Sequence, residues 1–374
     1  MSRSRQPRRQ ATLASIAAEL KISRTTVSNA YNRPDQLSAE LRERVLEVAK
    51  RRGYAGPDPM ARSLRTRKAG AVGVLLTEAL SYSFRDPAAM SFLSGLSEAC
   101  EAAGQGLLLI PAGPGRTDDE AAQVVHRSSV DGFVVYSVPA EDPDLAAVLE
   151  RHLPVVACDQ PRGLENTPVV GIDDRRAMRD LAAHLIELGH RQIGMLSMRL
   201  GRERHDGVVD LSTLESGAFH VQRERIRGVQ DAMSAAGLAP ETLTVVERYT
   251  HTAEDGLSAA AQIMRVNPRI TALVCTTDVL ALGALAWANQ MGLDVPGHLS
   301  ITGFDGIDEA IREGLTTVRQ PQKDKGRRAG ELLLAAPSHS GVPALETLGT
   351  QLWFGATSGR VESLMRISAK PKSS

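Results

Sequence analysis

At 374 residues the chain is too long for one ordinary hydrophobic core, so two or three domains are expected. Its hydrophobic content of 42% and charged content of 24% are typical of a globular protein, and no run of about 18 apolar residues indicates a membrane-spanning helix. The basic first ten residues lack the apolar segment of a signal peptide, which predicts a cytoplasmic protein.

The formal net charge of zero hides two segments of opposite charge. Residues 1–70 contain 16 Lys and Arg but only 6 Asp and Glu, so they carry a net charge of +10 and the rest of the chain one of −10. Such asymmetry indicates a nucleic-acid-binding module joined to a second, acidic part. A basic disordered tail is the alternative. Helical patterning from residue 11 onward favours the module, and only residues 1–10 are expected to form a tail.

Three helices are predicted within residues 11–56. The first follows Thr12 and has apolar residues at 13, 16, 17 and 20, the spacing of one face of an amphipathic helix. Ser23 is a suitable N-cap for a second helix about three residues further on. The third lies between Ser38 as N-cap and Gly53 as C-cap. Two short helices joined by so short a turn form a helix-turn-helix, a DNA-binding motif.

In a helix-turn-helix the N-terminal part of the second helix enters the major groove. Arg24, Thr25 and Asn29 are the polar residues on its outward face, and they are the expected base readers because Arg pairs with guanine and Asn with adenine. For Thr12 and Ser23 a plain capping role is an equal alternative to a phosphate contact, and one residue can do both. The short donors suited to phosphate oxygens are Thr12, Ser23, Thr26, Ser28 and Asn32.

The pattern Ser-x-x-Thr-Val-Ser at 23–28 and the segment Ala-Arg-Ser-Leu-Arg at 61–65 together resemble the lactose-repressor/galactose-repressor (LacI/GalR) family of bacterial transcription regulators. Further similar segments, such as Ile-Thr-Gly-Phe-Asp at 301–305, extend the resemblance over about residues 12–360. One departure is Lys21 in the turn, where the family commonly has Gly or Asn. A left-handed backbone there costs another residue about 1–2 kcal/mol, so a slightly different turn is expected.

Residues 57–69 are expected to form a hinge helix and linker. Pro59 suits the first turn of a helix, but a helix of under ten residues is unstable alone and needs a partner. The resemblance implies that paired hinge helices lie in the DNA minor groove, with Leu64 wedged between base pairs and Ala61 and Arg65 beside it. Leu64 as an ordinary core residue is the alternative, which the flanking basic residues argue against.

From residue 70 onward apolar strands alternate with amphipathic helices, which predicts doubly wound α/β domains. There are two such sets, and the resemblance implies a two-lobed core similar to periplasmic binding proteins. Residues 198–222 lack an apolar period and are expected to form a mobile loop, with a functional loop as the alternative. Residues 366–374 are expected to form a flexible tail. The lobe boundaries inferred from the sequence are 70–167 with 315–342 for the N-terminal lobe and 168–314 with 343–365 for the C-terminal lobe.

Ligands of open α/β sheets bind beyond the carboxyl ends of the strands, here in the crevice between the lobes. By the resemblance, Arg225 and Asp305 match effector contacts of the family. Arg can bind a hydroxyl or a carboxylate group, and Asp can accept hydrogen bonds from sugar hydroxyls or ring nitrogens. Asp278 is a weaker candidate because it can equally cap the helix that follows it. Thr277 stands where other members often have Asn. The remaining candidates, which lie after strands near positions that line the family pocket, are Phe84, Tyr136, Asp159 and His251.

Motifs of the enzyme classes are absent from the sequence. It has no phosphate-binding loop, nucleophile elbow or HExxH segment, and its nine histidines and three cysteines show no metal-ligand spacing. No catalytic residue, metal or cofactor is therefore expected, and Cys100, Cys158 and Cys275 are expected to be buried thiols. A transport-type binding protein is the other alternative, and the attached DNA-binding module argues against it.

The predicted function is that of a sequence-specific transcription regulator, by family default a repressor, which binds a near-palindromic operator as a homodimer. The resemblance implies allosteric control by a small-molecule effector, a sugar or related metabolite, bound between the two lobes. The C-terminal tail has no leucine heptads, so a tetramer-forming coil is not expected. The protein is expected in the cytoplasm, associated with the nucleoid while it is bound to DNA.

Overall fold

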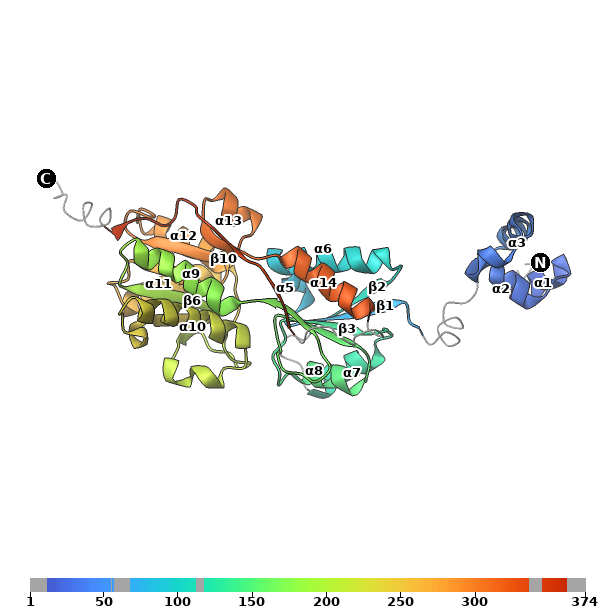
Figure 1. Ribbon diagram of the computed structural model, residues 1–374, viewed down its shortest axis with the longest axis horizontal. Coiled ribbons are helices and arrows are strands. Elements are labelled where there is room, and N and C mark those ends of the chain that lie inside the picture. Colours follow the sequence, from blue (N-terminus) through green and yellow to red (C-terminus); the bar gives the residue numbers. More distant parts are fainter. Residues whose placement is uncertain (1–11, 55, 57–67, 112–117, 336–344, 362–374) are drawn as a thin grey trace, which may run out of the picture. The chain divides into compact units, whose positions relative to one another are not determined.

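A computed structural model describes residues 12–54, 56, 68–111, 118–335 and 345–361 of the chain. The chain divides into two compact units, residues 1–69 and 70–374 (Figure 1). The first unit is helical, and the second contains two β-sheets with helices on both faces of each. The predicted helical headpiece followed by a two-lobed α/β core is confirmed. Within the described residues, no helix is both long and apolar enough to cross a membrane.

The first unit is a headpiece of three helices with a small shared core. Thr12, Ser23 and Ser38 cap the three helix N-termini, each accepting a hydrogen bond from the backbone N–H three residues further on. The helices are α1 (Leu13–Leu20), α2 (Arg24–Asn32) and α3 (Ala39–Arg52), with a 3-10 turn, η1 (Pro34–Gln36), before α3. Their buried side chains meet at the centre and are Ile16, Ala17, Val27, Ala30, Val45, Val48 and Ala49.

Lys21 ends α1 in the left-handed backbone conformation, with φ 54° and ψ 39°. Its backbone N–H donates to the carbonyl oxygens of Ala17 and Ala18, and these hydrogen bonds close the last turn of the helix. The altered turn expected for Lys21 is therefore not found. The turn takes the left-handed form that Gly or Asn would adopt easily, and the exposed Lys21 bears the conformational cost.

The first lobe of the second unit is built on a six-stranded sheet of order β12-β5-β4-β3-β1-β2, in which all pairs are parallel. Helices α6 (Pro87–Ala102) and α14 (Gln322–Leu334) cover one face, and α7 (Asp118–Arg127) and α8 (Pro143–Glu150) cover the other. A short helix, α5 (Leu80–Ser83), follows the first strand. The strands are β1 (Ala71–Leu76), β2 (Gly106–Pro111), β3 (Phe133–Tyr136), β4 (Val155–Cys158), β5 (Val169–Ile172) and β12 (Leu345–Leu348).

Two glycines let α14 lie directly on α6, although the helices are far apart in sequence. A Cβ atom added at Gly95 would lie 1.8 Å from the carbonyl oxygen of Lys323, and one at Gly326 would lie 1.9 Å from that of Phe92. No larger side chain fits at either crossing point without moving backbone. Helix α14 is thus firmly part of the first lobe.

The second lobe is built on a seven-stranded sheet of order β13-β11-β10-β9-β6-β8-β7. Its inner pairs are parallel, and the edge strands β13 and β7 are antiparallel to their neighbours. Helices α9 (Asp174–Glu187) and α10 (His220–Ala235) cover one face, and α11 (Ala253–Val266) and α12 (Asp278–Gln290) the other. The remaining elements are β6 (Ile193–Met198), β7 (Gly207–Val208), η2 (Leu211–Ser216), η3 (Pro240–Thr242), β8 (Thr244–Arg248), β9 (Ala272–Cys275), β10 (Ser300–Asp305), α13 (Asp308–Arg312), β11 (Thr316–Arg319) and β13 (Gln351–Trp353).

The lobe boundaries inferred from the sequence need correction at three strands. β5, which was assigned to the C-terminal lobe, pairs with β4 and β12 in the first sheet. β11, assigned to the N-terminal lobe, pairs with β10 in the second sheet, and β12 belongs to the first sheet instead of the second. The chain therefore crosses between the sheets three times: after β5, after β11 and between β12 and β13. Apolar strands look alike in sequence, so their neighbours are decided only when the sheet assembles.

Residues 198–222 are not the featureless loop expected from their lack of an apolar period. β7 pairs antiparallel with β8, and the 3-10 helix η2 follows it. Leu200 and Leu214 enter the core beside α9 and α10. Irregular spacing concealed these anchors, because neither a strand nor a helix period runs through the segment.

Candidate functional site

The N-terminal end of α2 presents two of the three expected base readers to solvent. Arg24 and Thr25 are exposed in the first turn of this helix. Asn29 is half-buried, and its Nδ2 donates a hydrogen bond to Oε1 of Gln36, 3.2 Å away. Gln36 lies in η1 and therefore orients Asn29, a role for which the sequence had no signal. A bidentate contact from Asn29 to adenine would need this hydrogen bond to be exchanged.

The expected phosphate contacts divide into caps and intrahelical pairs. Thr12 and Ser23 both cap helices, as their alternative interpretation proposed, and the Ser23 hydroxyl lies 2.8 Å from the Thr26 hydroxyl. Nδ2 of Asn32 donates to the carbonyl and hydroxyl oxygens of Ser28, each 3.1 Å away. These hydrogen bonds fix the side chains in place. The hydroxyl groups of Ser23, Thr26 and Ser28 keep further hydrogen-bonding capacity for a phosphate oxygen. The hinge candidates Ala61, Leu64 and Arg65 lie outside the described residues.

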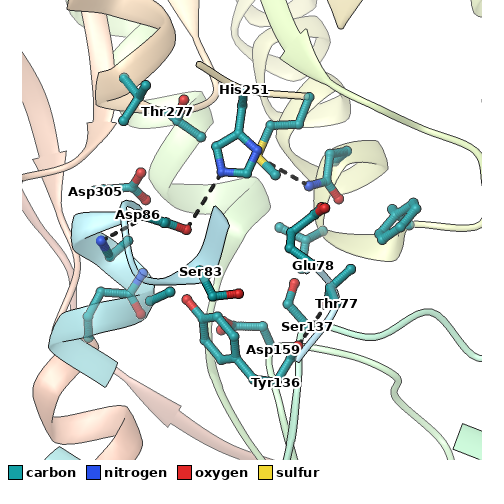
Figure 2. Close-up of a pocket in the computed structure, with 18 of the residues that line it drawn as sticks. Thr77, Glu78, Ser83, Asp86, Tyr136, Ser137, Asp159, His251, Thr277 and Asp305 are labelled. Carbon is teal, nitrogen blue, oxygen red and sulfur yellow. Dashed lines mark hydrogen bonds and ion pairs between the residues drawn. The ribbon is translucent and has the colours of Figure 1, made fainter. Parts of the chain in front are cut away.

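A cleft of about 810 Å³, including its open mouth, lies between the two sheets of the second unit. It opens where strand order reverses in each sheet: β1 lies between β2 and β3, and β6 lies between β8 and β9. Ligands of doubly wound sheets bind at such switch points. Residues at the C-terminal ends of β1, β3 and β9 line the cleft, and Figure 2 shows several of them converging on it: Thr77, Glu78, Tyr136, Ser137 and Thr277.

Arg225, on α10, is buried in the floor of this cleft. Its Nε donates to Oδ1 of Asp174, 2.9 Å away, and its Nη1 donates to the carbonyl oxygen of Thr276 at 2.6 Å. The guanidinium also lies 3.8 Å from the centre of the Phe304 ring. Burial raises the pKa of Asp174, and the charge of Arg225 opposes that shift. Arg225 is therefore held in one orientation at the point where the sequence placed an effector contact.

Asp305 ends β10 and faces the same cleft with a strained backbone, φ 122°. Its Oδ1 accepts a hydrogen bond of 2.6 Å from Nε2 of Gln320. Burial raises the pKa of the Asp305 carboxyl well above its usual range, while the charge of Arg225 opposes this. A non-glycine residue at this φ is uncommon and marks backbone strain, which occurs preferentially at functional sites.

A hydrogen-bonded chain along the lining of the cleft joins the two lobes. Lys325, on α14, is completely buried, and its Nζ donates to Oδ1 and Oδ2 of Asp159 at 2.9 and 2.8 Å. The same Nζ donates to Oε1 of Gln320 at 2.9 Å, and Gln320 in turn donates to Asp305. Gln320 lies in the second crossover between the sheets. The chain from Asp159 to Asp305 thus runs from one lobe to the other, and Lys325 and Gln320 were missed in the sequence.

Three further contacts bridge the two lobes at the cleft. Nε2 of His251 lies 3.6 Å from Oδ2 of Asp86, as Figure 2 shows, and the Tyr82 hydroxyl donates to the His251 carbonyl oxygen at 3.1 Å. Arg199 Nη2 lies 2.6 Å from Oε1 of Glu78. These residues follow strands of opposite lobes, so each contact favours the closed arrangement of the two sheets. Only His251 was expected from the sequence.

Of the remaining sequence candidates, some line the cleft and some do not. Tyr136 lines the cleft and stacks on Phe92 with ring centres 4.2 Å apart. Thr277 also lines it and caps α12. Phe84, by contrast, is 55% exposed and does not line the cleft.

Asp278 does not line the cleft either, because its side chain is turned into the protein. It accepts hydrogen bonds from the Ile307 N–H at 2.8 Å and the Thr317 hydroxyl at 2.6 Å. Burial raises the pKa of Asp278 to about 6, and these hydrogen bonds oppose the shift. Its carboxylate therefore ties the end of β10 to β11, a structural role other than the helix cap considered from the sequence.

Known proteins resemble this chain over nearly its whole length. A periplasmic binding protein-like domain is matched at residues 182–358. A helix-turn-helix transcriptional regulator of Mycolicibacterium smegmatis is 58% identical over 96% of this chain and 99% of its own length. A crystal structure of a LacI-family regulator from Corynebacterium glutamicum is 42% identical, with a TM-score of 0.73 over 94% of this chain and all of that one.

A lac repressor dimer bound to operator and the anti-inducer ONPF shares the fold, with 22% identity and a TM-score of 0.75 over 94% of this chain and all of that one. The matches to regulators span both the headpiece and the two-lobed core, as the sequence motifs implied. The chain therefore belongs to the LacI/GalR family and is a helix-turn-helix transcription regulator, a DNA-binding and non-enzymatic protein that acts in the cytoplasm.

Proposed function

We propose that the protein is a repressor that binds a near-palindromic operator as a homodimer, and that a small polar effector in the cleft controls its affinity for DNA. The observation that supports this most is the hydrogen-bonded chain from Asp159 through Lys325 and Gln320 to Asp305. Its two ends line the cleft and its middle lies in a crossover between the lobes. A ligand that binds Asp159 or Asp305 therefore changes the contacts that set the angle between the lobes.

The lining of the cleft favours a neutral, hydroxyl-rich effector such as a sugar. Four carboxylates face it, from Glu78, Asp86, Asp159 and Asp305, while Arg199 and Arg225 are already paired with carboxylates. Glu78 and Asp159 are themselves paired, with Arg199 and Lys325, so an anion would have to displace an existing ion pair to gain a cation from the described lining. Carboxylates and amides arranged around an aromatic ring suit the hydroxyl groups and apolar face of a sugar.

For the headpiece, we propose that Arg24, Thr25 and Asn29 read bases and that Thr12, Ser23, Thr26, Ser28 and Asn32 contact phosphates. The exposed first turn of α2 supports this assignment. Residues 57–69 would act as the hinge between the units, with Leu64 as a wedge in the minor groove and Ala61 and Arg65 beside it. While bound to its operators the protein would be associated with the nucleoid.

A thermal-shift screen of the full chain with sugars, sugar phosphates and nucleobases tests the effector proposal. A ligand at 100 times its Kd should add about 2.7 kcal/mol to the free energy of unfolding. Arg225→Ala and Asp305→Ala should abolish that shift, whereas Phe84→Ala, outside the cleft, should retain it. The active ligand should also change operator affinity in a gel-shift assay. A ligand that stabilises Arg225→Ala and Asp305→Ala as well as the unaltered protein would show that it binds elsewhere.

A further inference from the structure

A second cavity lies on the rim of the second unit, apart from the cleft. It measures about 780 Å³, including its open mouth, and shares no lining residue with the cleft. Residues 139–141 and 160–162 of the first lobe form one wall. The other wall comes from the second lobe, from residues 215–218 together with His220 and Arg223 at the start of α10. The irregular segment before α10 therefore builds a site that bridges the lobes.

Three buried nitrogen atoms of this lining lack a hydrogen-bond partner among the described residues. They are Nε of Arg162, Nε2 of His220 and Nε of Arg223. Buried donors are paired in the great majority of cases, so three such atoms around one cavity are unusual. All three side chains are basic, and they come from both lobes. The missing acceptor is therefore expected to be an anion that reaches all of them.

The two arginines are held in place by other atoms of their guanidinium groups. Nη2 of Arg162 donates to the Ile172 carbonyl oxygen at 3.0 Å, and Nη1 of Arg223 donates to the Gly217 carbonyl oxygen. These bonds anchor one side of each group and leave its Nε uncommitted. A preorganised arginine loses little conformational entropy when it binds an oxyanion.

The N-terminus of α10 adds to the positive potential of the cavity. This helix has 16 residues, and its own N-cap residue, Phe219, makes no side-chain capping hydrogen bond. Oε1 of Gln160 instead reaches across from the first lobe and accepts from the Val221 N–H at 3.1 Å. The free N–H groups and the helix dipole at such an end favour negative charge.

The acidic residues of the rim do not neutralise these cations. Glu215 is paired with Arg227, and its side chain is 74% exposed. Glu141 is exposed as well. Burial lowers the pKa of His220, and the charge of Arg162 acts in the same direction. The charge of Glu224 opposes this shift.

We propose that this cavity binds a phosphate group, either of inorganic phosphate or of a small phosphate ester, between Arg162 of the first lobe and His220 and Arg223 of the second. Phosphate oxygens accept hydrogen bonds from several arginine and histidine donors at once. Because the ligand touches both lobes, it stabilises their closed arrangement. It is a second input to the regulator at a site separate from the cleft, and it is coupled to the cleft through the closure of the lobes.

The test is calorimetric titration of the full chain with sodium phosphate at constant ionic strength. The unaltered protein should show saturable binding, and Arg162→Gln and Arg223→Gln should each weaken it about tenfold or more. Arg202→Gln is the matched control. Arg202 lies on the same rim, where it donates to the Glu141 carbonyl oxygen at 3.0 Å, but it does not line the cavity. Arg202→Gln should bind phosphate as the unaltered protein does.

Two results would overturn the proposal: no saturable binding to the unaltered protein, or equal binding by all variants. Unfolding midpoints without phosphate identify any variant that fails to fold. His220→Gln keeps the test decisive in that case, because it removes the imidazole and leaves both arginines. A parallel titration with glycerol phosphate distinguishes the two sources of the ligand: tighter binding than that of inorganic phosphate indicates an ester, and weaker binding indicates the free ion.

Discussion

Glu78 and Arg199 form an ion pair across the cleft, with Oε1 of Glu78 2.6 Å from Nη2 of Arg199. The Arg199 side chain is 6% exposed and that of Glu78 16%. The rings of Phe219 and Tyr249 lie 5.1 and 4.8 Å from the Arg199 guanidinium, which limits its contact with water. The pair therefore combines a direct charge contact between the two lobes with partial burial.

We expect Glu78→Gln to lower the free energy of unfolding by about 1–3 kcal/mol, because it leaves Arg199 buried without its counter-charge. A double-mutant cycle with Arg199→Gln, followed by urea unfolding, measures the coupling. The exposed Glu98–Lys323 pair, with a separation of 2.6 Å, is the control, and its coupling should stay below about 1 kcal/mol. Equal coupling in the two pairs would show that the Glu78–Arg199 contact behaves as an ordinary surface pair.

The base readers can be tested on the operator that the protein itself selects from a random DNA library. Arg24→Ala and Asn29→Ala should each reduce specific affinity by about 1–3 kcal/mol and relax sequence preference at one position. Arg44→Ala, which removes an exposed charge from α3, should leave the preference unchanged. Selected sequences identical for Arg24→Ala and the unaltered protein would remove Arg24 from the reading surface.

Lys21 offers a test of backbone strain in the turn. Since its φ is 54°, Lys21→Gly should relieve part of the left-handed cost and stabilise the headpiece by up to about 1 kcal/mol, offset by the greater freedom of glycine in the unfolded chain. Amide hydrogen exchange of the headpiece helices in the full chain measures the change. Ala18→Gly is the control, because it introduces glycine at an exposed position with ordinary helical backbone. It should destabilise the headpiece by about 0.5–1 kcal/mol.

His190 should make the stability of the core depend on pH. It is buried, with Nδ1 2.9 Å from the Thr271 hydroxyl and Nε2 3.1 Å from the Ser300 hydroxyl, and burial lowers its pKa below 6.5. Below pH 6.5 the unfolded chain binds a proton that the folded state does not, so the free energy of unfolding should fall as the pH decreases. The slope for one group is at most about 1.4 kcal/mol per pH unit.

Urea unfolding at pH 7.5 and 5.5 measures this dependence. In His190→Gln the free energy of unfolding should depend less on pH, because the contribution of His190 is removed. The raised pKa of Asp278 acts with the opposite sign, so the informative quantity is the difference between His190→Gln and the unaltered protein. An identical pH dependence in the two proteins would contradict the prediction.

A variant of Asp278 can show whether this residue has a structural or a ligand-binding role. Asp278→Ala leaves the Ile307 N–H and the Thr317 hydroxyl without their acceptor and should cost about 2–4 kcal/mol of stability. Effector affinity, measured by calorimetry below the unfolding temperature, should change much less than in Asp305→Ala. A variant of normal stability that no longer binds the effector would instead place Asp278 in the binding site.

The features that the sequence predicted well are those formed by residues near one another in the chain. The helices α1 and α3 follow from apolar spacing and caps, and the candidates Tyr136, Asp159, Arg225, His251, Thr277 and Asp305 all line the cleft. Phe84 and Asp278 do not line it, because the direction in which a side chain leaves the backbone depends on packing.

By itself the sequence determined the headpiece, the alternation of strands and helices and the edge of the sheets at which polar residues gather. Helix caps and hydrophobic periods act within a few residues, so they can be read locally. Only the tertiary structure decided the sheet that β5, β11 and β12 join, the pairing of Asp159 with Lys325 and that of Glu78 with Arg199. Asp159 and Lys325 are 166 residues apart, and such contacts depend on which buried surfaces meet when the lobes assemble.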